Sequence, residues 1–465
     1  MSRARTWALA AFASAACLQI IWSSRIPVGI YYDDALYLCF ARALSHLSIV
    51  LPDGRVHTDL LPSFGLLLAL PVRLFAPRFE LLRYFAVALT WIASFMTWRL
   101  ARGFLDENWA LAAAALFALN TGVMMHCGAL MPDIAYTALS LALFAGLGSR
   151  RLGWLAAGAA AAALMRPQGV LLILSLALAI AAARGLKRAV VFLASALTLP
   201  ACWFALCFRF SQTTGDYLGQ WHRAMARLAE SGGQLGHAAL QVVILGGGAL
   251  NASFLPGFAD LALGFLMLGL AAGGVARGLK GPHRPQILAM AAYFVAILCL
   301  HQTWFLQGYR YFIPLTSILW IFVLLAVKPW LERRGRLALG ALAALLVLAV
   351  YQDVAMLPPA GSPPTLWPET MAWIAANTPA QARFQSIHDA SVMLFTGRPA
   401  VGFTRDLDSR EQWLAQCASL HVDYALVNQG TALRTPWFKP DESLSLVYRN
   451  PAEDSLLFAI GRSAP

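Results

Sequence analysis

The stretch "GIYYDDALYLCFARAL", from Gly29 to Leu44, carries two adjacent carboxylates, Asp33 and Asp34, beside a run of apolar residues. An ionised carboxylate that faces water can take a proton from an acceptor hydroxyl and so act as a general base. The same two acids could instead be the N-cap and first-turn residues of a helix, where they would complement the helix dipole. The pair alone leaves both interpretations open.

Three further charged residues stand where apolar runs begin or end. Arg166 precedes Pro167 between two such runs, Arg310 lies in "GYRYF", and Asp133 follows Met131 and Pro132. A guanidinium fork suits a phosphate, so Arg166 and Arg310 are candidate phosphate ligands. The alternatives are a hinge position for Arg166, an interfacial anchor for Arg310 and a helix N-cap for Asp133. Three histidines near similar boundaries lack the tight spacing of a metal site, namely His57, His126 and His301.

The composition of the chain indicates that these residues are positioned by membrane-spanning helices. The chain has 465 residues, of which 59% are hydrophobic and only 12% charged, with a mean hydropathy of +0.62. This composition predicts an α-helical polytopic membrane protein with about eleven transmembrane helices, each near the roughly 20 residues that a crossing needs. The first run could instead be a cleaved signal peptide, although its length favours a retained helix. The expected spans are 6–23, 82–101, 108–125, 133–148, 152–165, 167–183, 189–208, 256–276, 286–301, 312–327 and 337–356.

The basic residues predict the orientation, because cytoplasmic loops carry the excess of Lys and Arg. Every second connection is basic, from Arg3 and Arg5 to the group between 328 and 336. The N-terminus is therefore expected in the cytoplasm and the C-terminus outside, with Asp33 and Asp34 also external. The net charge of +12 expresses this bias and does not indicate a nucleic-acid surface. The seven cysteines form neither a disulfide framework nor a metal pattern.

Three external stretches are long enough to hold structure. The first, 25–81, contains candidate helices at 34–47 and 62–75 that can lie in the membrane interface. The second, 209–255, contains the candidate helix "DYLGQWHRAMARLAE". The third follows the Pro-rich segment "LPPAGSPPTLWP" and alternates helices at 369–376 and 409–420 with the candidate strands "ARFQSI", "VDYALV", "LSLVY" and "LLFAI". We therefore expect a membrane domain over 1–356 and a small external α/β domain over 357–465.

Several of these stretches match one known group of proteins in the same order. "YYDDALYLCFARAL" resembles the first external loop of the glycosyltransferase C superfamily, in the branch of protein O-mannosyltransferases and aminoarabinose transferases. "MPDIAYTALSLALF" is similar to the loop and fourth helix of that branch, and "QGYRYFIPL" to its Arg-Tyr-hydrophobic-Pro stretch. "LMRPQGVLL" resembles its Arg-Pro-Glu-Gly stretch, with Gln168 in place of Glu. "TPAQARFQSIHDASVMLFTGRPAV" resembles the opening of the external domain, so the resemblance covers most of the chain.

The resemblance implies an enzyme that moves a sugar from a polyprenyl-phosphate carrier to an acceptor hydroxyl with inversion, a hexosyl- or pentosyltransferase without a nucleotide. The acceptor would be a lipid, a glycan or a protein at the outer face of a bacterial inner membrane. Asp33 or Asp34 would be the general base, and Arg310 and Arg166 would bind the phosphate. Asp133 and Asp59 would support the acceptor or a divalent metal ion. Asp59 lies in "TDLLPSFGL", at the Glu of the Glu-Lys-Pro-Pro-Leu stretch of aminoarabinose transferases, but this chain has no Lys there.

The rival class is a transporter or lipid flippase without transferase activity, in which the boundary acids and Arg166 would line a substrate or proton path. The sequence shows no paired inverted repeats, and transport does not explain an external α/β tail. A family member that serves only as a scaffold is a third alternative.

The alternation of basic connections generates a topology prediction. Reporter fusions after Arg102, Arg188 and Arg336 should give cytoplasmic signals, whereas fusions after Gly233 and Ser386 should give external ones. The measurement is the ratio of alkaline phosphatase to fluorescent-protein activity for each fusion. An external signal from the Arg188 fusion would overturn the map.

Overall fold

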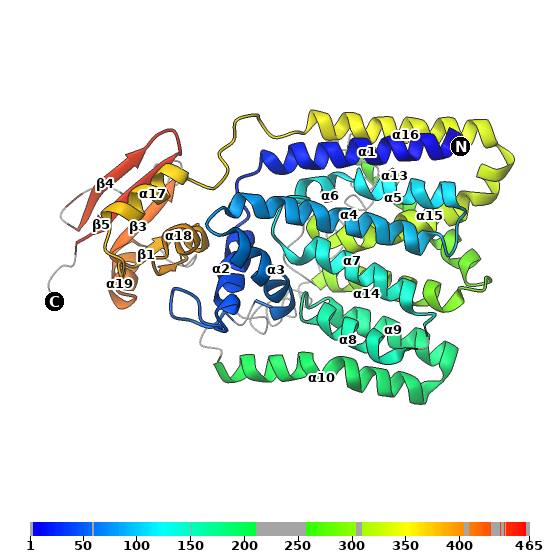
Figure 1. Cartoon of the computed structure of the whole chain (residues 1–465), viewed down its shortest axis with the longest axis horizontal. Helices are drawn as coiled ribbons and strands as arrows, with labels where there is room; N and C mark the ends of the chain where they lie inside the picture. Colours follow the sequence, from blue (N-terminus) through cyan, green and yellow to red (C-terminus); the bar gives the residue numbers. More distant parts are fainter. Residues whose placement is uncertain are drawn as a thin grey trace. The chain divides into compact units, whose positions relative to one another are not determined.

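The chain forms two compact units in a computed structural model (Figure 1). The structure describes residues 3–57, 60–149, 151–210, 257–303, 309–403, 409–428, 438, 441 and 443–461. Asp59 and the candidate helix "DYLGQWHRAMARLAE" lie outside the described residues. Unit 1 consists of Met1–Ser24, Leu61–Phe64 and Arg83–Pro358, and unit 2 of Arg25–Leu60, Gly65–Leu82 and Pro359–Pro465.

Unit 1 is helical, and seven helices in the described residues are long and apolar enough to cross a membrane. These spans lie in α1 (Arg3–Ser24), α4 (Leu82–Ala101) with the preceding turn η1 (Phe79–Leu81), α10 (Leu186–Phe210), α13 (Gly257–Gly278), α14 (Arg284–Thr303), α15 (Ile313–Arg333) with the preceding turn η2 (Tyr309–Phe312), and α16 (Gly335–Ala355). The protein is therefore a mostly helical membrane protein, as the composition predicts. The other four expected spans coincide with shorter helices, so a total of eleven crossings stays a prediction.

The shorter helices are α5 (Glu107–Ala118), α6 (Thr121–His126), α7 (Pro132–Gly146), α8 (Leu152–Ala163) and α9 (Gly169–Arg184). The single helix expected over 108–125 is wrong, because α5 ends at Ala118 and α6 begins at Thr121. The cause is Asn120, which has an extended backbone and accepts a hydrogen bond from the Val123 amide at 3.2 Å as an N-cap. An apolar run can therefore contain a helix break that hydropathy does not reveal.

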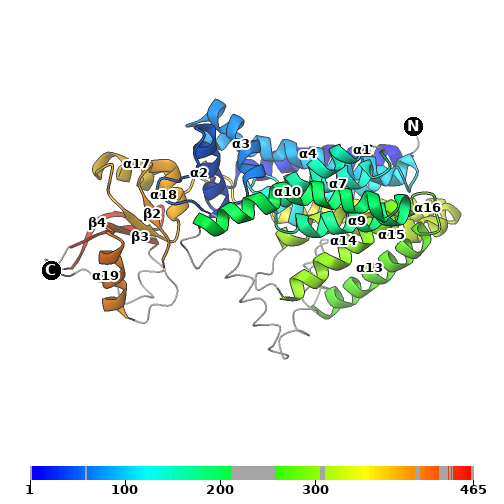
Figure 2. The same cartoon turned by 90° about the horizontal axis from the view of Figure 1, so that it is seen from below.

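The helices of unit 1 pack along their length, with α13 beside α15, α14 beside α9, and α1 beside α5 and α16 (Figures 1 and 2). At Gly274 the α13 backbone touches the α15 backbone, because a Cβ there would lie 1.9 Å from the Phe322 carbonyl oxygen. Small residues allow such close approach between membrane helices. The adjacent Gly273 has room, with Ala326 Cβ 3.8 Å from an added Cβ.

Unit 2 contains a five-stranded mixed sheet with the strand order β2-β1-β3-β5-β4. The strands are β1 (Phe384–Ser386), β2 (Ala400–Val401), β3 (Tyr424–Asn428), β4 (Leu444–Asn450) and β5 (Ser455–Ile460). β1 pairs in parallel with β2 and β3, whereas β5 pairs antiparallel with β3 and β4. The helices of this unit include α17 (Pro368–Asn377), α18 (Asp389–Thr396) and α19 (Arg410–Ser419). All four strand segments expected from the sequence form strands, and both expected helices form.

Most of the loop between α1 and α4, namely Arg25–Leu60 and Gly65–Leu82, belongs to the same compact unit as this sheet. Its helix α2 (Asp33–Ser45) packs against α18, and Val28 exchanges backbone hydrogen bonds with the tail, to Pro364 O at 3.1 Å and from Leu366 N at 2.9 Å. Helix α3 (Pro62–Phe75) follows, with Gly65 close against Phe40 of α2. A folding boundary at residue 357 stays a prediction, since the compact unit of the tail also includes the loop.

The contact between α13 and α15 generates a stability prediction. Gly274→Ala should destabilise the protein by on the order of 2 kcal/mol, because the new methyl group forces two helix backbones apart. Gly273→Ala is the matched control and should be neutral or slightly stabilising. Thermal unfolding of the purified variants in detergent measures both. Equal midpoints for the two variants would contradict the close contact.

Candidate functional site

A buried ion pair joins two of the residues singled out from the sequence. Asp133 lies in the first turn of α7, and Arg166 lies in the connection between α8 and α9. The Arg166 guanidinium contacts Asp133 Oδ1, and their side chains are only 13% and 4% exposed. The second oxygen, Asp133 Oδ2, accepts no hydrogen bond from the residues that the structure describes. The N-cap interpretation of Asp133 is wrong, because Met131 occupies the N-cap position.

Arg310 lies beside this pair and shares an aromatic neighbour with it. Its Nη2 donates a hydrogen bond to Tyr311 Oη at 2.8 Å, and its guanidinium carbon is 4.9 Å from the centre of that ring. The Arg166 guanidinium carbon lies 5.7 Å from the same ring centre. Arg310 Nη1 also approaches Met131 Sδ at 3.4 Å, next to the start of α7. Tyr311 therefore contacts both arginines, a role that the sequence pattern did not assign to it.

Two neutral side chains complete the group from another pair of helices. Gln168 stands at the N-cap of α9, and its Nε2 lies 3.4 Å from His301 Nε2 on α14. The His301 ring packs against Tyr311, with 5.3 Å between the ring centres. We call Asp133, Arg166, Gln168, His301, Arg310 and Tyr311 the polar cluster. Two guanidinium groups and one carboxylate give it a formal charge of +1 with His301 neutral, which favours an anionic ligand.

The two acids of the opening stretch lie in unit 2 and differ in environment. Asp33 begins α2 and is half-buried, whereas Asp34 is 2% exposed. Asp34 accepts backbone hydrogen bonds from Gly29 N and Ala35 N, both at 2.8 Å. Burial raises the pKa of Asp34 to about 6, an effect that these hydrogen bonds partly oppose. Both acids occupy the first turn of α2, but neither is its N-cap, which is Tyr32.

The segment around the two acids is fixed by the tail. The Tyr32 side chain is hydrogen-bonded to the carboxyl group of Asp389, the first residue of α18. Burial raises the pKa of Asp389 to about 6. Ser391 Oγ donates to Gly29 O at 3.1 Å, and Gly29 has a φ of 96°, where a Cβ would lie 2.7 Å from that Oγ. The conformation of the loop beside Asp33 therefore depends on α18.

The described residues do not assemble a metal centre. No three His, Cys, Asp or Glu side chains among them lie close enough together to hold an ion. His57 Nε2 pairs with Asp53 Oδ2 at 2.8 Å, and His126 is buried with a ring nitrogen 2.7 Å from Gly122 O. Asp59 lies outside the described residues, and its part in metal binding stays a prediction.

The fold matches those of membrane glycosyltransferases of known structure. ArnT from Cupriavidus metallidurans bound to undecaprenyl phosphate aligns with a TM-score of 0.63 at 15% identity, over 98% of both chains. The oligosaccharyltransferase AglB from Archaeoglobus fulgidus, in complex with an inhibitory peptide and a dolichol-phosphate, aligns with a TM-score of 0.59 at 14% identity, over 91% of this chain and 70% of that one. The same archaeal enzyme has been solved with Zn and sulfate.

The mycobacterial arabinofuranosyltransferase AftD aligns with a TM-score of 0.53 at 16% identity, over 100% of this chain and 42% of that one. No protein-family profile matches the sequence, and no curated protein sequence matches it. The chain therefore shares the fold of these membrane glycosyltransferases at low sequence identity.

The buried ion pair generates a double-mutant prediction. Arg166→Gln should lower the free energy of unfolding by about 3–5 kcal/mol, because it leaves the Asp133 carboxylate buried without its counter-charge. The double variant with Asp133→Asn should lose less than the sum of the two single variants. Lys328→Gln is the control, since it breaks an exposed pair with Glu332 and should cost less than about 1 kcal/mol. Additive losses, measured by unfolding in mixed micelles, would contradict the pairing.

Proposed function

We propose that the protein is an inverting glycosyltransferase that moves a sugar from a polyprenyl-phosphate carrier to an acceptor hydroxyl. The acceptor is a lipid, a glycan or a protein, and the reaction takes place at the outer face of a bacterial inner membrane. The observation that carries the proposal is the polar cluster, a buried group with a formal charge of +1, in a fold shared with proteins solved with undecaprenyl phosphate and dolichol-phosphate.

The reaction needs one bond formed, one bond broken and one proton moved. The acceptor oxygen attacks the anomeric carbon from the face opposite the phosphate, and the bond between that carbon and the phosphate oxygen breaks. The electron pair of this bond leaves with the polyprenyl phosphate. The acceptor proton passes to a carboxylate, which therefore has to be ionised before the step.

The polar cluster supports the part of the proposal that concerns the phosphate. In the transition state, negative charge grows on the leaving phosphate, and fixed positive groups in a site of low dielectric stabilise it most effectively. Arg166 is held by Asp133, and Arg310 by Tyr311, so neither guanidinium has to be ordered when the donor arrives. Asp133 is then a positioning residue, and the acceptor-binding role expected for it becomes secondary.

The environments of the two acids support a division of roles between them. Both Asp34 oxygens already accept backbone hydrogen bonds in a buried site, which suits a residue that fixes the loop. Asp33, one position earlier, is half-buried and turned by about 100 degrees on the helix. We therefore assign the general base to Asp33 and the support of its loop to Asp34.

This assignment generates a kinetic prediction. Asp33→Asn should lower turnover by roughly 10² to 10⁴, the usual contribution of a general base, with donor binding nearly unchanged. Purified protein is incubated with radiolabelled polyprenyl-phosphate sugars, and both transfer and hydrolysis are measured. Asp106→Asn is the matched control: Asp106 caps α5 through Asn108 N and Trp109 N, and Asn caps equally well.

Two outcomes would revise the assignment. If Asp33→Asn keeps near wild-type turnover while Asp34→Asn is folded and inactive, the base is Asp34. If both variants stay active, the catalytic role of this loop is wrong. Failure of the wild-type protein to transfer or hydrolyse any donor, together with movement of the labelled lipid between leaflets of a vesicle, would favour a flippase.

A further inference from the structure

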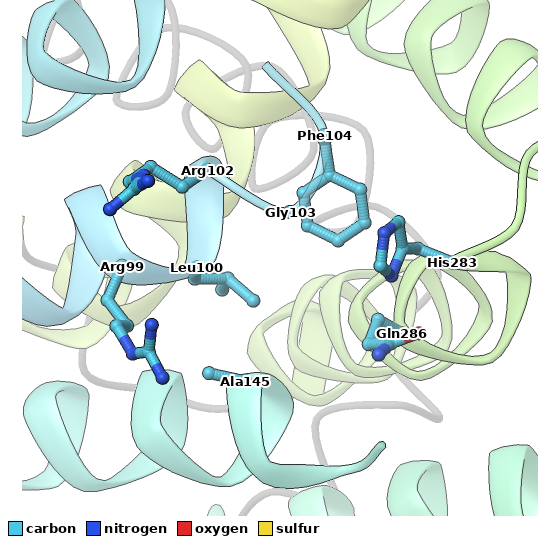
Figure 3. Close-up of a pocket in the computed structure, with 8 residues that line it drawn as sticks. All are labelled: Arg99, Leu100, Arg102, Gly103, Phe104, Ala145, His283 and Gln286. Atoms are coloured by element: carbon cyan, nitrogen blue, oxygen red, sulfur yellow. The ribbon is translucent and has the colours of Figure 1, made fainter. Parts of the chain in front are cut away.

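Unit 1 contains an open cavity of about 320 Å³, whose lining residues are drawn in Figure 3. It lies at the end of unit 1 opposite the polar cluster, as the course of the helices shows. Helix α7 begins at the cluster and ends at this cavity, while α14 begins at the cavity and ends at the cluster. Helix α9 also begins at the cluster and ends at an adjoining cavity. The proposed function uses no residue at this end. The lining residues are Arg99, Leu100, Arg102, Gly103, Phe104, Ala145, His283 and Gln286.

The polar side of the cavity carries two arginines, of which only Arg102 has an interaction partner among the described residues. Arg102 Nε contacts Glu107 at 3.0 Å, and its guanidinium carbon lies 5.0 Å from the Trp98 ring centre. The exposed guanidinium of Arg99 has no ion-pair or hydrogen-bond partner among the described residues. Across the cavity, Figure 3 shows His283 facing Phe104, with an edge contact of 5.6 Å between ring centres. The Arg99 guanidinium is therefore available to bind an anionic ligand, and the half-buried imidazole of His283 lies on the other side of the cavity.

A second cavity of about 300 Å³ adjoins the first, because His283 and Gln286 line both. Its walls are mainly apolar and include Leu147, Ala179, Ile180, Ala183, Pro282 and Pro285. Its one arginine, Arg184, is already engaged, since its Nη2 donates to Leu147 O at 2.6 Å and Ser149 O at 2.7 Å. The two cavities together offer a cationic compartment next to an apolar one, which is the arrangement that an amphiphilic anion requires.

We propose that this double cavity binds an anionic phospholipid from the leaflet at the basic end of unit 1. The phosphodiester contacts Arg99 and Arg102, with His283 and Gln286 as hydrogen-bond donors, and the glycerol and first acyl carbons occupy the apolar compartment. Basic pockets between membrane helices recognise the head groups of anionic lipids in the cytoplasmic leaflet, which the predicted topology places at this end. Guanidinium forks suit the phosphate oxygens in geometry and charge.

The test is lipid binding to the purified full-length protein, measured by native mass spectrometry. Dioleoyl phosphatidylglycerol should bind more tightly than dioleoyl phosphatidylcholine, and Arg99→Gln should weaken phosphatidylglycerol binding by about fivefold, as expected for one basic residue near the head group. Arg188→Gln is the matched control, because it removes the same charge from an exposed position on α10 outside both cavities. It should leave binding unchanged.

Four results would overturn the proposal. The first is equal affinity for the anionic and the zwitterionic lipid. The second is an equal loss in Arg99→Gln and Arg188→Gln, which would indicate a diffuse surface effect. The third is competition by millimolar inorganic phosphate that displaces the lipid completely, which would indicate a site for free phosphate. The unfolding midpoint of lipid-free Arg99→Gln should equal that of the wild type, and a lowered midpoint would count against a ligand-binding role.

Discussion

The pairing of a buried guanidinium with a buried carboxylate constrains one end of the helical unit. Removing either charge from water is costly, and the cost is offset only where the partner is held in place. Arg166 and Asp133 meet this condition because the connection between α8 and α9 lies against the first turn of α7. The same constraint fixes neighbouring groups, since Tyr311 contacts both arginines and His301 packs on Tyr311. The polar cluster is thus positioned by helix ends, by the short connection between α8 and α9 and by the turn η2.

In unit 2, the packing of α2 against α18 gives the adjacent acids Asp33 and Asp34 different environments. The contact between α2 and α18 buries Asp34 and Asp389, and it raises the pKa of each to about 6. Gly29 makes this possible, because its positive φ and missing Cβ let the loop approach Ser391. Asp33 lies at the edge of the same contact and is half-buried. Asp33 and Asp34 are neighbours of the same residue type, but they differ in burial because of the surface against which α2 packs.

The parts of the fold that follow from local pattern could be predicted from the sequence. Long apolar runs located the seven spans, and apolar runs bounded by turn residues located four of the five strands of the tail, β1, β3, β4 and β5. The short strand β2 and the helix α18 were not predicted. Within the site, Arg166, Arg310 and Asp133 were found because charge is rare in apolar surroundings. Tyr311 and the Asn120 break were missed, because an aromatic or an Asn at a helix boundary has several ordinary roles. The joining of the first loop to the tail could not be predicted, since it depends on contacts between residues more than 300 positions apart.

The many basic residues of the connections and the few buried charges of the polar cluster have different roles in this protein. The basic connections gather many Lys and Arg residues, and some of these already bind helix carbonyls, as Arg277 does with Leu325 O at 2.9 Å and Ala326 O at 2.6 Å. Such residues orient and anchor helices without forming a site. Among the described residues at the opposite end, Arg166 and Asp133 are largely buried and hold each other in place. Gln168 adds to this effect: a carboxylate at its position would cancel the formal charge of +1 of the polar cluster, whereas the amide preserves it while contacting His301. The buried cluster, and not the larger basic surface, therefore has the electrostatic character that the proposed transfer from a polyprenyl phosphate requires.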